Sequence, residues 1–292
     1  MNSLPPSVRR HALPIPHLRV SNQHATALIC LQGAQVMRYQ SAGAAPLLWA
    51  AEEEFWVAGK NLRGGVPVCW PWFGPHAREA ALPQHGWVRQ RDWQLVEAAD
   101  LPGQGTRLVL EAATAVALPD FPPTLHARME ITVGKTLQLS LTSRNSGAGP
   151  VRVEDALHSY FLVGDARDLA LENLGGLAYL DLLDGMKEKR EPAGDVRPVP
   201  PVTRVYRDAP DRMVIADPVL RRRILIRTQG CRSAVLWSPG EATAAAMADL
   251  GSAWTRMVCL ESGNCKEAAL TLAPGAAHSS RVEYAVEPWP PA

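Results

Sequence analysis

The sequence predicts an all-β protein, a large two-sheet antiparallel β-sandwich with few short helices. Short segments in which apolar and polar residues alternate recur along the chain, whereas long segments with a 3.6-residue period are rare. The 25 prolines and 22 glycines are scattered between these segments, which is typical of many strands joined by turns.

The clearest pair of predicted strands lies in the middle of the chain. Apolar residues occupy every second position over 129–133 and again over 137–141. Gly134 and Lys135 between them predict a two-residue type II′ turn, because glycine readily takes the positive φ that this turn needs first. We therefore expect a β-hairpin with one buried face. Further strands are expected at 27–31, 107–110, 224–226, 234–237, 270–272 and 282–286.

Helix signals are few, and one segment could be mistaken for a linker. The best helix candidate covers 241–250, which is alanine-rich and is followed by Gly251 as a possible stop. Residues 188–202 hold four prolines and a glycine and predict an exposed loop or strap. The chemically dense segments described below lie on both sides of this strap and need each other. We therefore expect one domain that spans residues 1–292.

Charge and hydropathy exclude several classes of partner. The chain has 30 basic and 29 acidic side chains, so no bulk attraction to nucleic acid or to a membrane surface is expected. Arg221, Arg222 and Arg223 lead into an apolar segment and predict a solvated strand start rather than a polyanion patch. No apolar run approaches the length of a membrane span or of a signal sequence. We expect a cytoplasmic monomer whose partner is a small molecule.

The cysteines and histidines give no sign of a disulfide framework, a metal or a cofactor. The eight histidines lack the close spacing of metal ligands. No phosphate-binding glycine loop and no Gly-x-Ser-x-Gly motif is present, which disfavours nucleotide chemistry and nucleophile-elbow hydrolases. The odd number of cysteines, without a Cys-x-x-Cys pair, predicts reduced and mostly buried thiols at Cys30, Cys69, Cys231, Cys259 and Cys265.

The first chemically dense segment covers 61–89 and combines bent backbone, aromatic rings and polar side chains. A sugar that carries a phosphate needs these groups, because flat rings stack on its C–H faces, hydroxyls take directional hydrogen bonds and guanidinium groups bind phosphate. The structural alternative is a proline-rich core loop with two surface arginines. The candidate binding residues here are Arg63, Trp72, Gln84, His85 and Arg89.

Two later segments each carry one candidate acid or base. His158 lies among apolar and aromatic neighbours, where a histidine taken alone is more often a hydrogen-bonded core residue than a catalyst. Glu261 ends an apolar run, and a carboxylate buried there costs free energy unless it is paired or used in chemistry. For Glu261 the structural alternative is an ion pair with an arginine.

Taken together, these segments resemble the hexose-6-phosphate mutarotases (glucose-6-phosphate 1-epimerases), a branch of the aldose 1-epimerase superfamily. The resemblance covers most of the chain and implies a galactose-mutarotase-like β-sandwich that binds sugar in an open cleft on one concave sheet face. The shared order of the motifs is more specific than any motif alone. The motifs are residues 62–74, 84–89, 156–165, 174–181, 204–206 and 257–261.

The resemblance also implies roles for individual residues. The catalytic histidine of the family's His-[Thr/Ser]-Tyr-Phe motif falls on His158, and the catalytic glutamate of Val-Cys-x-Glu falls on Glu261. His85 matches a second histidine that lines the sugar site. Arg63 and Arg89 match two arginines that look suited to the phosphate. No cofactor and no metal is implied.

The chain departs from the family pattern at several positions near the sugar. Thr203 stands where relatives usually carry an aspartate that contacts the sugar. Ser238 and Gly240 replace the asparagine and second tryptophan of a Trp-Asn-Pro-Trp motif, Thr243 stands at a following lysine, and Ser262 replaces a proline. These changes put the identity of the substrate in question while the acid–base pair is retained.

An aldose exchanges anomers by opening its ring, rotating about C1–C2 and closing on the other face. A catalyst must therefore take the proton of the C1 hydroxyl and give one to the ring oxygen. We expect ionised Glu261 as the base and protonated His158 as the acid. The sequence thus predicts an isomerase that interconverts the α and β anomers of a hexose 6-phosphate such as glucose 6-phosphate.

Two other functions are open on the sequence. The altered positions at Thr203, Ser238 and Gly240 motivate a non-catalytic sugar-phosphate-binding protein, which retention of His158 and Glu261 disfavours. An aldose 1-epimerase that acts on unphosphorylated sugar is the other alternative. The predicted phosphate arginines disfavour it.

Overall fold

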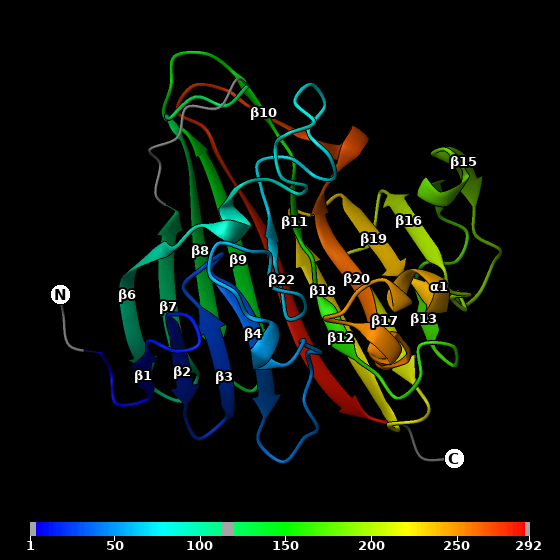
Figure 1. The fold of residues 1–292 in the computed structure, drawn as a ribbon, viewed down its shortest axis with the longest axis horizontal. Helices are drawn as coiled ribbons and strands as arrows, with labels where there is room; N and C mark the ends of the chain where they lie inside the picture. The colour runs from blue at the N-terminus through cyan, green and yellow to red at the C-terminus, as the bar shows by residue number, and fades with distance from the viewer. Residues whose placement is uncertain (1–3, 113–119, 290–292) are drawn as a thin grey trace.

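The computed structural model describes residues 4–112 and 120–289, and within them the predicted all-β fold is confirmed (Figure 1). Every strand pair in this part of the chain is antiparallel, and the strands form two large sheets and two small ones. The only α-helix among these residues, α1, spans Gly240–Ala245. Five 3-10 turns accompany it: η1 Glu53–Phe55, η2 Val88–Gln90, η3 Leu182–Asp184, η4 Gly251–Arg256 and η5 Lys266–Ala268.

One eight-stranded sheet, called the site sheet below, carries Thr203 and Glu261 on two of its strands, and His158 lies between two others. Seven of its strands follow one path of neighbours, and β12 Tyr160–Leu162 pairs with one end of β20. In order, the path is β15 Lys187–Arg190, β14 Ala178–Asp181, β16 Val202–Arg207, β19 Ser233–Ser238, β20 Met257–Asn264, β11 Asp155–Leu157 and β5 Val68–Cys69.

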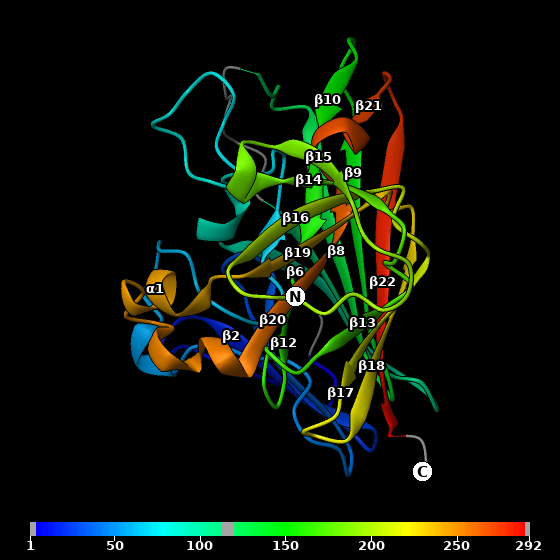
Figure 2. The same cartoon turned by 90° about the vertical axis from the view of Figure 1, so that its right-hand side faces the viewer.

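The second eight-stranded sheet, called the outer sheet, contains the long C-terminal strand β22. Figure 2 shows β14, β16 and β19 of the site sheet running across the direction of β22 and β9. In the outer sheet, the order of the strands is β13 Ala170–Glu172, β17 Arg212–Asp217, β18 Arg222–Gln229, β22 Ala277–Pro288, β9 Leu137–Asn145, β8 Leu125–Val133, β7 Gly105–Ala112 and β6 Trp93–Leu101.

A four-stranded sheet and a two-stranded ribbon complete the fold. The four-stranded sheet lies beside β6, β7 and β8 in Figure 1. One continuous apolar cluster contains buried side chains of this sheet, of the site sheet and of the outer sheet. The strands are β1 Val8–His11, β2 His17–Ser21, β3 Ala25–Cys30 and β4 Gln35–Ser41 in the sheet, and β10 Val151–Val153 and β21 Leu270–Leu272 in the ribbon.

Strand β20 is buried along its whole length, which sets the geometry of the site. Side chains alternate between the two faces of a strand. Val258 and Leu260 belong to the core shared with the outer sheet. Met257 and Cys259 belong to a separate cluster on the opposite face. The alternation therefore directs Glu261 away from the shared core and onto the outward face of the site sheet.

The predicted hairpin is present, but its turn was predicted wrongly. In β8 and β9, the expected side chains at 129–133 and 137–141 alternate into the core. Val133 pairs directly with Leu137, so three residues rather than two form the loop. Gly134 does not take the left-handed φ that a type II′ turn requires, and its N–H donates to the carbonyl of Thr136 at 3.1 Å.

The predicted helix over 241–250 is wrong in length. After α1 the chain turns, and the N–H of Met247 donates to the carbonyl of Ala244 at 2.9 Å. This turn lets Leu250 pack into the apolar cluster that contains Met257. Gly251, with φ 50°, then begins η4 instead of ending a helix.

Two other local predictions need correction. The strap over 188–202 begins inside the edge strand β15, because Glu188 pairs with Leu180 of β14.

The basic run at 221–223 is not solvated throughout. Arg222 is 4% exposed, and its guanidinium donates to backbone carbonyls, among them that of Pro46 at 2.8 Å. The five cysteines are free and buried, as predicted.

A buried polar network ties the site sheet to the outer sheet. Asp155 of β11 accepts hydrogen bonds from the backbone N–H and the side-chain amide of Asn264, both at 3.0 Å, and from Ser280 of β22 at 2.8 Å. All three residues are at most 1% exposed. A buried polar group without its partners costs free energy, so this network constrains how β20 sits on β22.

We predict that Asn264→Ala lowers the free energy of unfolding by roughly 1–3 kcal/mol, because it leaves the buried Asp155 carboxyl short of donors. Urea unfolding of the variant and the wild type measures this difference. The matched control is Gln94→Ala on an exposed position of β6, where no change is expected. Equal stability of wild type and Asn264→Ala would contradict the role given to the network.

Candidate active site

A cavity of about 430 Å³ opens on the outward face of the site sheet. Three larger hollows, of about 450, 560 and 730 Å³, lie elsewhere on the surface, and none of them holds a buried histidine or a buried carboxylate. Of the eight residues selected from the sequence, the smaller cavity brings seven together: Arg63, Gln84, His85, Arg89, His158, Thr203 and Glu261.

His158 lies in a two-residue break between β11 and β12. Both strands pair with β20, Leu157 opposite Ser262 and Tyr160 opposite Cys259. The break therefore faces the part of β20 that carries Glu261. The backbone N–H of His158 donates to the carbonyl of Pro67 at 2.9 Å. This N–H is therefore hydrogen-bonded although His158 does not belong to a strand.

His158 and Glu261 form a buried pair. Nε2 of His158 is 3.3 Å from Oε1 of Glu261, and the two residues are 7% and 1% exposed. The His158 ring lies nearly parallel to the ring of Tyr160, with 4.9 Å between centroids. Two chain segments about a hundred residues apart thus place one acid–base pair at the floor of the cavity.

Burial changes the protonation expected for this pair. It raises the pKa of Glu261 well above its ordinary range, against the charge of Arg89, which lowers it. Burial, and then the positive charges of Arg89 and Arg63, lower the pKa of His158 well below 6.5. These shifts favour a neutral Glu261 beside a neutral His158 in the ligand-free protein, and the ionised pair expected from the sequence stays a prediction. The neutral pair and the ionised pair hold the same number of protons. Transfer of one proton from the Glu261 carboxyl to Nε2 of His158, across the 3.3 Å contact, converts the neutral pair into the ionised pair.

Three buried polar atoms at the cavity have no hydrogen-bond partner within the described residues. They are Nδ1 of His158, Oε2 of Glu261 and Nε of Arg89. Buried polar atoms are paired in the great majority of cases, and exceptions require a reason. A polar ligand in the cavity would satisfy these atoms.

His85 is held in one tautomer by the backbone. Its Nδ1 lies 3.2 Å from the N–H of Gly74 and accepts from it, so the ring proton is on Nε2. Burial, and then the charges of Arg89 and Lys266, lower the pKa of His85 to about 3. His85 is therefore a neutral hydrogen-bond donor toward the cavity. Gly86 makes this position possible, because a Cβ there would lie 1.7 Å from the carbonyl oxygen of Trp70.

The two arginines differ in their surroundings. Arg89 lies on η2, is 7% exposed, and its charge acts on both members of the acid–base pair. Arg63 is more exposed, and its Nε donates to Oδ1 of Asp249 at 2.7 Å. The chain after Arg63 passes so close to β4 that a Cβ on Gly65 would lie 2.1 Å from the carbonyl oxygen of Val36.

Thr203 and Trp72 are placed very differently. Thr203 of β16 pairs with Trp237 of β19, and both line the cavity. Trp72 does not line it. Its indole N–H donates to the carbonyl of Pro83 at 3.1 Å, and its ring stacks on Phe121 at 5.5 Å. Trp72 therefore packs the loop behind the cavity instead of facing a ligand there.

Sequence reasoning missed several residues of the cavity wall. Lys266 lies five positions after Glu261, just past the end of β20, and that proximity was an available signal. Asp249, which pairs with Arg63 but does not itself line the cavity, is 186 positions from Arg63 and had no local signal. Met247 lines the cavity from the turn after α1.

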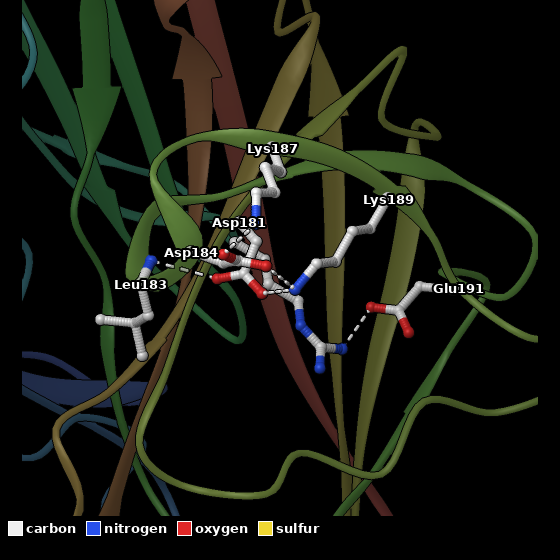
Figure 3. Close-up of polar contacts among 7 residues, drawn as sticks. Asp181, Leu183, Asp184, Lys187, Lys189 and Glu191 are labelled. Carbon is white, nitrogen blue, oxygen red and sulfur yellow. Dashed lines mark hydrogen bonds and ion pairs between the residues drawn. The ribbon is translucent and has the colours of Figure 1, made fainter.

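Leu182 reaches the cavity from η3 at the edge of the site sheet. Figure 3 shows the charged side chains around this turn. Nζ of Lys189 bridges Asp181 and Asp184 at 2.8 and 2.9 Å, and Lys187 contacts Asp184 at 2.8 Å. Each exposed pair contributes little on its own, but the bridging lysine joins both ends of the turn that presents Leu182.

Neither a metal-ligand cluster nor a membrane-spanning helix is present in the described part of the chain. Within 4–112 and 120–289, no group of three or more histidine, cysteine, aspartate or glutamate side chains could hold a metal ion. No helix in that part of the chain is long and apolar enough to cross a membrane. The prediction of a cofactor-independent protein stays a prediction.

A β-sandwich that buries a histidine–glutamate pair in a polar cavity belongs to the class of proteins suited to acid–base chemistry on a small polar molecule. A sequence model of the aldose 1-epimerase family matches residues 16–285. The chain belongs to this family.

Individual relatives agree with this assignment. A protein of Escherichia coli (strain K12), provisionally named glucose-6-phosphate 1-epimerase, is 34% identical over 253 residues, which cover 85% of this chain and 83% of that protein. A similarly named protein of Cenchrus ciliaris is 29% identical over 278 residues, covering 91% and 83%. The crystal structure of YeaD from Salmonella typhimurium, provisionally described as a mutarotase, superposes with a TM-score of 0.88 at 28% identity over 99% of this chain and 96% of that one.

We predict that His158 is neutral at pH 7 in the ligand-free protein. Its pKa is lowered below 6.5, so the imidazolium form is populated only at pH values near or below that lowered pKa. Long-range ¹H–¹⁵N NMR of the imidazole rings distinguishes the two forms, and the signal that disappears in His158→Asn identifies the residue. An imidazolium pattern for this signal at pH 7 would contradict the electrostatics described above.

Proposed function

We propose that the protein is a hexose-6-phosphate mutarotase, an isomerase that interconverts the α and β anomers of glucose 6-phosphate or a similar aldohexose 6-phosphate. The observation that carries the proposal is the His158–Glu261 contact at 3.3 Å, whose remaining polar atoms are buried without partners. Ring opening needs one base and one acid on the same small molecule, and this pair supplies both. The names of the relatives support the substrate class.

The proposed mechanism uses the single proton of the pair. In the productive form Glu261 is ionised and takes the proton of the C1 hydroxyl, while protonated His158 gives its proton to the ring oxygen. The charge of Arg89 stabilises the carboxylate of this form and disfavours its imidazolium. After rotation about C1–C2 the two groups exchange roles and the ring closes. His85, which donates from Nε2, is suited to bind the oxygen that becomes a carbonyl.

Arg63 and Arg89 are the phosphate contacts proposed from the sequence. Both line the cavity, and guanidinium groups bind phosphate through paired hydrogen bonds. Arg89 also has a second role, because its charge lowers the pKa values of both His158 and Glu261. Arg63, held by Asp249, acts on His158 less strongly than Arg89 does and is the better probe of phosphate recognition.

We predict that Glu261→Gln and His158→Asn each slow anomer exchange of glucose 6-phosphate by roughly 10²–10⁴-fold, because each removes one positioned acid or base. Exchange NMR measures the rate directly on the anomeric protons. Matched controls are His76→Asn and Glu191→Gln, which make the same changes at buried residues outside the cavity. Wild-type exchange rates in either active-site variant, with an unchanged melting temperature, would refute the assignment.

We predict that Arg63→Ala lowers the ratio of kcat/KM for glucose 6-phosphate to that for glucose by roughly 10- to 150-fold, the value of one charge-assisted hydrogen bond. Arg89→Ala should slow both reactions, because Glu261 loses the charge that favours its ionised form. The same exchange assay on both sugars measures the ratio. A wild-type protein that prefers free glucose would favour an ordinary aldose 1-epimerase, and saturable binding without exchange would favour a sugar-phosphate-binding protein.

The organisation of the chain is part of the proposal. We propose that residues 1–292 act as one domain, because a single apolar cluster joins side chains from Val8 to Tyr284. Activity in the cytoplasm as a monomer stays a prediction, and the five free, buried cysteines are compatible with a reducing compartment.

A further inference from the structure

We infer that Lys266 binds the phosphate of the substrate at the end of the cavity next to His85. The inference rests on the proposed function and names a residue of the site that the sequence did not indicate. It is carried by the position of Lys266, by the way its backbone is held and by its lack of an acidic partner.

Lys266 follows β20 as the first residue of η5 and lines the same cavity as the acid–base pair. Its Nζ is 3.4 Å from the carbonyl oxygen of Phe73 and 5.9 Å from the centre of the Phe73 ring. A Cβ on Gly74 would lie 3.4 Å from Nζ, so the glycine leaves the ammonium group open on this side. The charge of Lys266 also acts on His85, where it lowers the pKa together with burial and the charge of Arg89.

The backbone of Lys266 adopts a conformation that costs free energy. Its φ of 56° lies in the left-handed region, which residues other than glycine seldom occupy. Such conformations persist only where the surroundings enforce them, and they concentrate at functional sites.

A closed set of contacts holds this conformation. Nη2 of Arg152 donates to the carbonyl of Lys266 at 2.8 Å and contacts Oε1 of Glu154 at 3.1 Å. Oε2 of Glu154 accepts from the N–H of Phe73 at 2.9 Å, and the carbonyl of Phe73 accepts from Lys266. The lysine is therefore fixed at both its backbone and its ammonium group, against the loop that carries His85.

The three cations of the cavity differ in how their charge is compensated. Arg63 is paired with Asp249, and Arg89 acts on Glu261. Lys266 has no carboxylate within ion-pair distance anywhere in residues 4–112 and 120–289. A phosphate monoester carries close to two negative charges at neutral pH. A dianion that enters this cavity therefore meets two cations without an ion-pair partner in the described residues, the ammonium group of Lys266 and the guanidinium group of Arg89.

The test uses a pair of variants chosen for the backbone as well as the charge. Lys266→Asn removes the charge, and asparagine tolerates the left-handed conformation better than most residues. Lys266→Arg keeps the charge. Lys135→Asn, in the exposed loop between β8 and β9, is the matched control. Anomer exchange of glucose 6-phosphate and of glucose, inhibition by inorganic phosphate and melting temperature are measured for all four proteins.

We expect Lys266→Asn to lower the ratio of kcat/KM for glucose 6-phosphate to that for glucose by about 10-fold or more. Inhibition by inorganic phosphate should weaken in parallel, while Lys266→Arg and the control stay within about threefold of wild type. An unchanged ratio in Lys266→Asn overturns the inference. Equal losses on both sugars also overturn it, because they indicate a structural role.

The failure of the inference can be distinguished from the failure of the proposed function. A wild-type protein that does not accelerate anomer exchange of glucose 6-phosphate contradicts the proposed function. In that case, calorimetric titration with inorganic phosphate still tests Lys266, with weaker binding by Lys266→Asn expected. Equal phosphate affinity of the wild type and Lys266→Asn then overturns the inference.

Discussion

The contact between His158 and Glu261 is the interaction on which the rest of the site depends. Removing two ionisable groups from water is costly, and in this protein both lie almost completely out of solvent. The cost is limited because the two groups can share one proton as a neutral pair. The charge of Arg89 stabilises the carboxylate when Glu261 is ionised. The neutral and the ionised pair hold the same number of protons. Such a pair is suited to giving a proton to one oxygen of a sugar while it takes a proton from another oxygen.

The fold supplies this contact through the register of one strand. The alternation along β20 gives the outer-sheet core its apolar side chains and gives the cavity Glu261. If β20 were shifted by one residue, Glu261 would face the core and the apolar side chains would face the cavity. The network of Asp155, Asn264 and Ser280 fixes the register at the end of β20, where β11, β20 and β22 meet. Polar groups that would be costly without partners thus hold in place the strand that carries Glu261.

The sequence predicted what depends on periodicity and on contiguous motifs. Alternation over 129–141 indicated the hairpin, and the motifs around His158 and Glu261 indicated the acid–base pair. Contacts between distant segments were not predictable in this way. Asp249 meets Arg63 only because the turn after α1 folds over the cavity, and Trp72 faces Phe121 although its neighbour Phe73 lines the cavity. Protonation also could not be predicted, because it depends on burial that the sequence does not specify.

The most direct test of the account is a crystal structure of the Glu261→Gln variant with glucose 6-phosphate bound. This substitution keeps the shape of the side chain while it removes the base, so the substrate should persist in the cavity. We predict that the C1 hydroxyl lies within hydrogen-bond distance of the side chain at position 261 and that the ring oxygen lies within hydrogen-bond distance of the His158 ring. A sugar bound with C1 and its ring oxygen away from both residues would contradict the central claim.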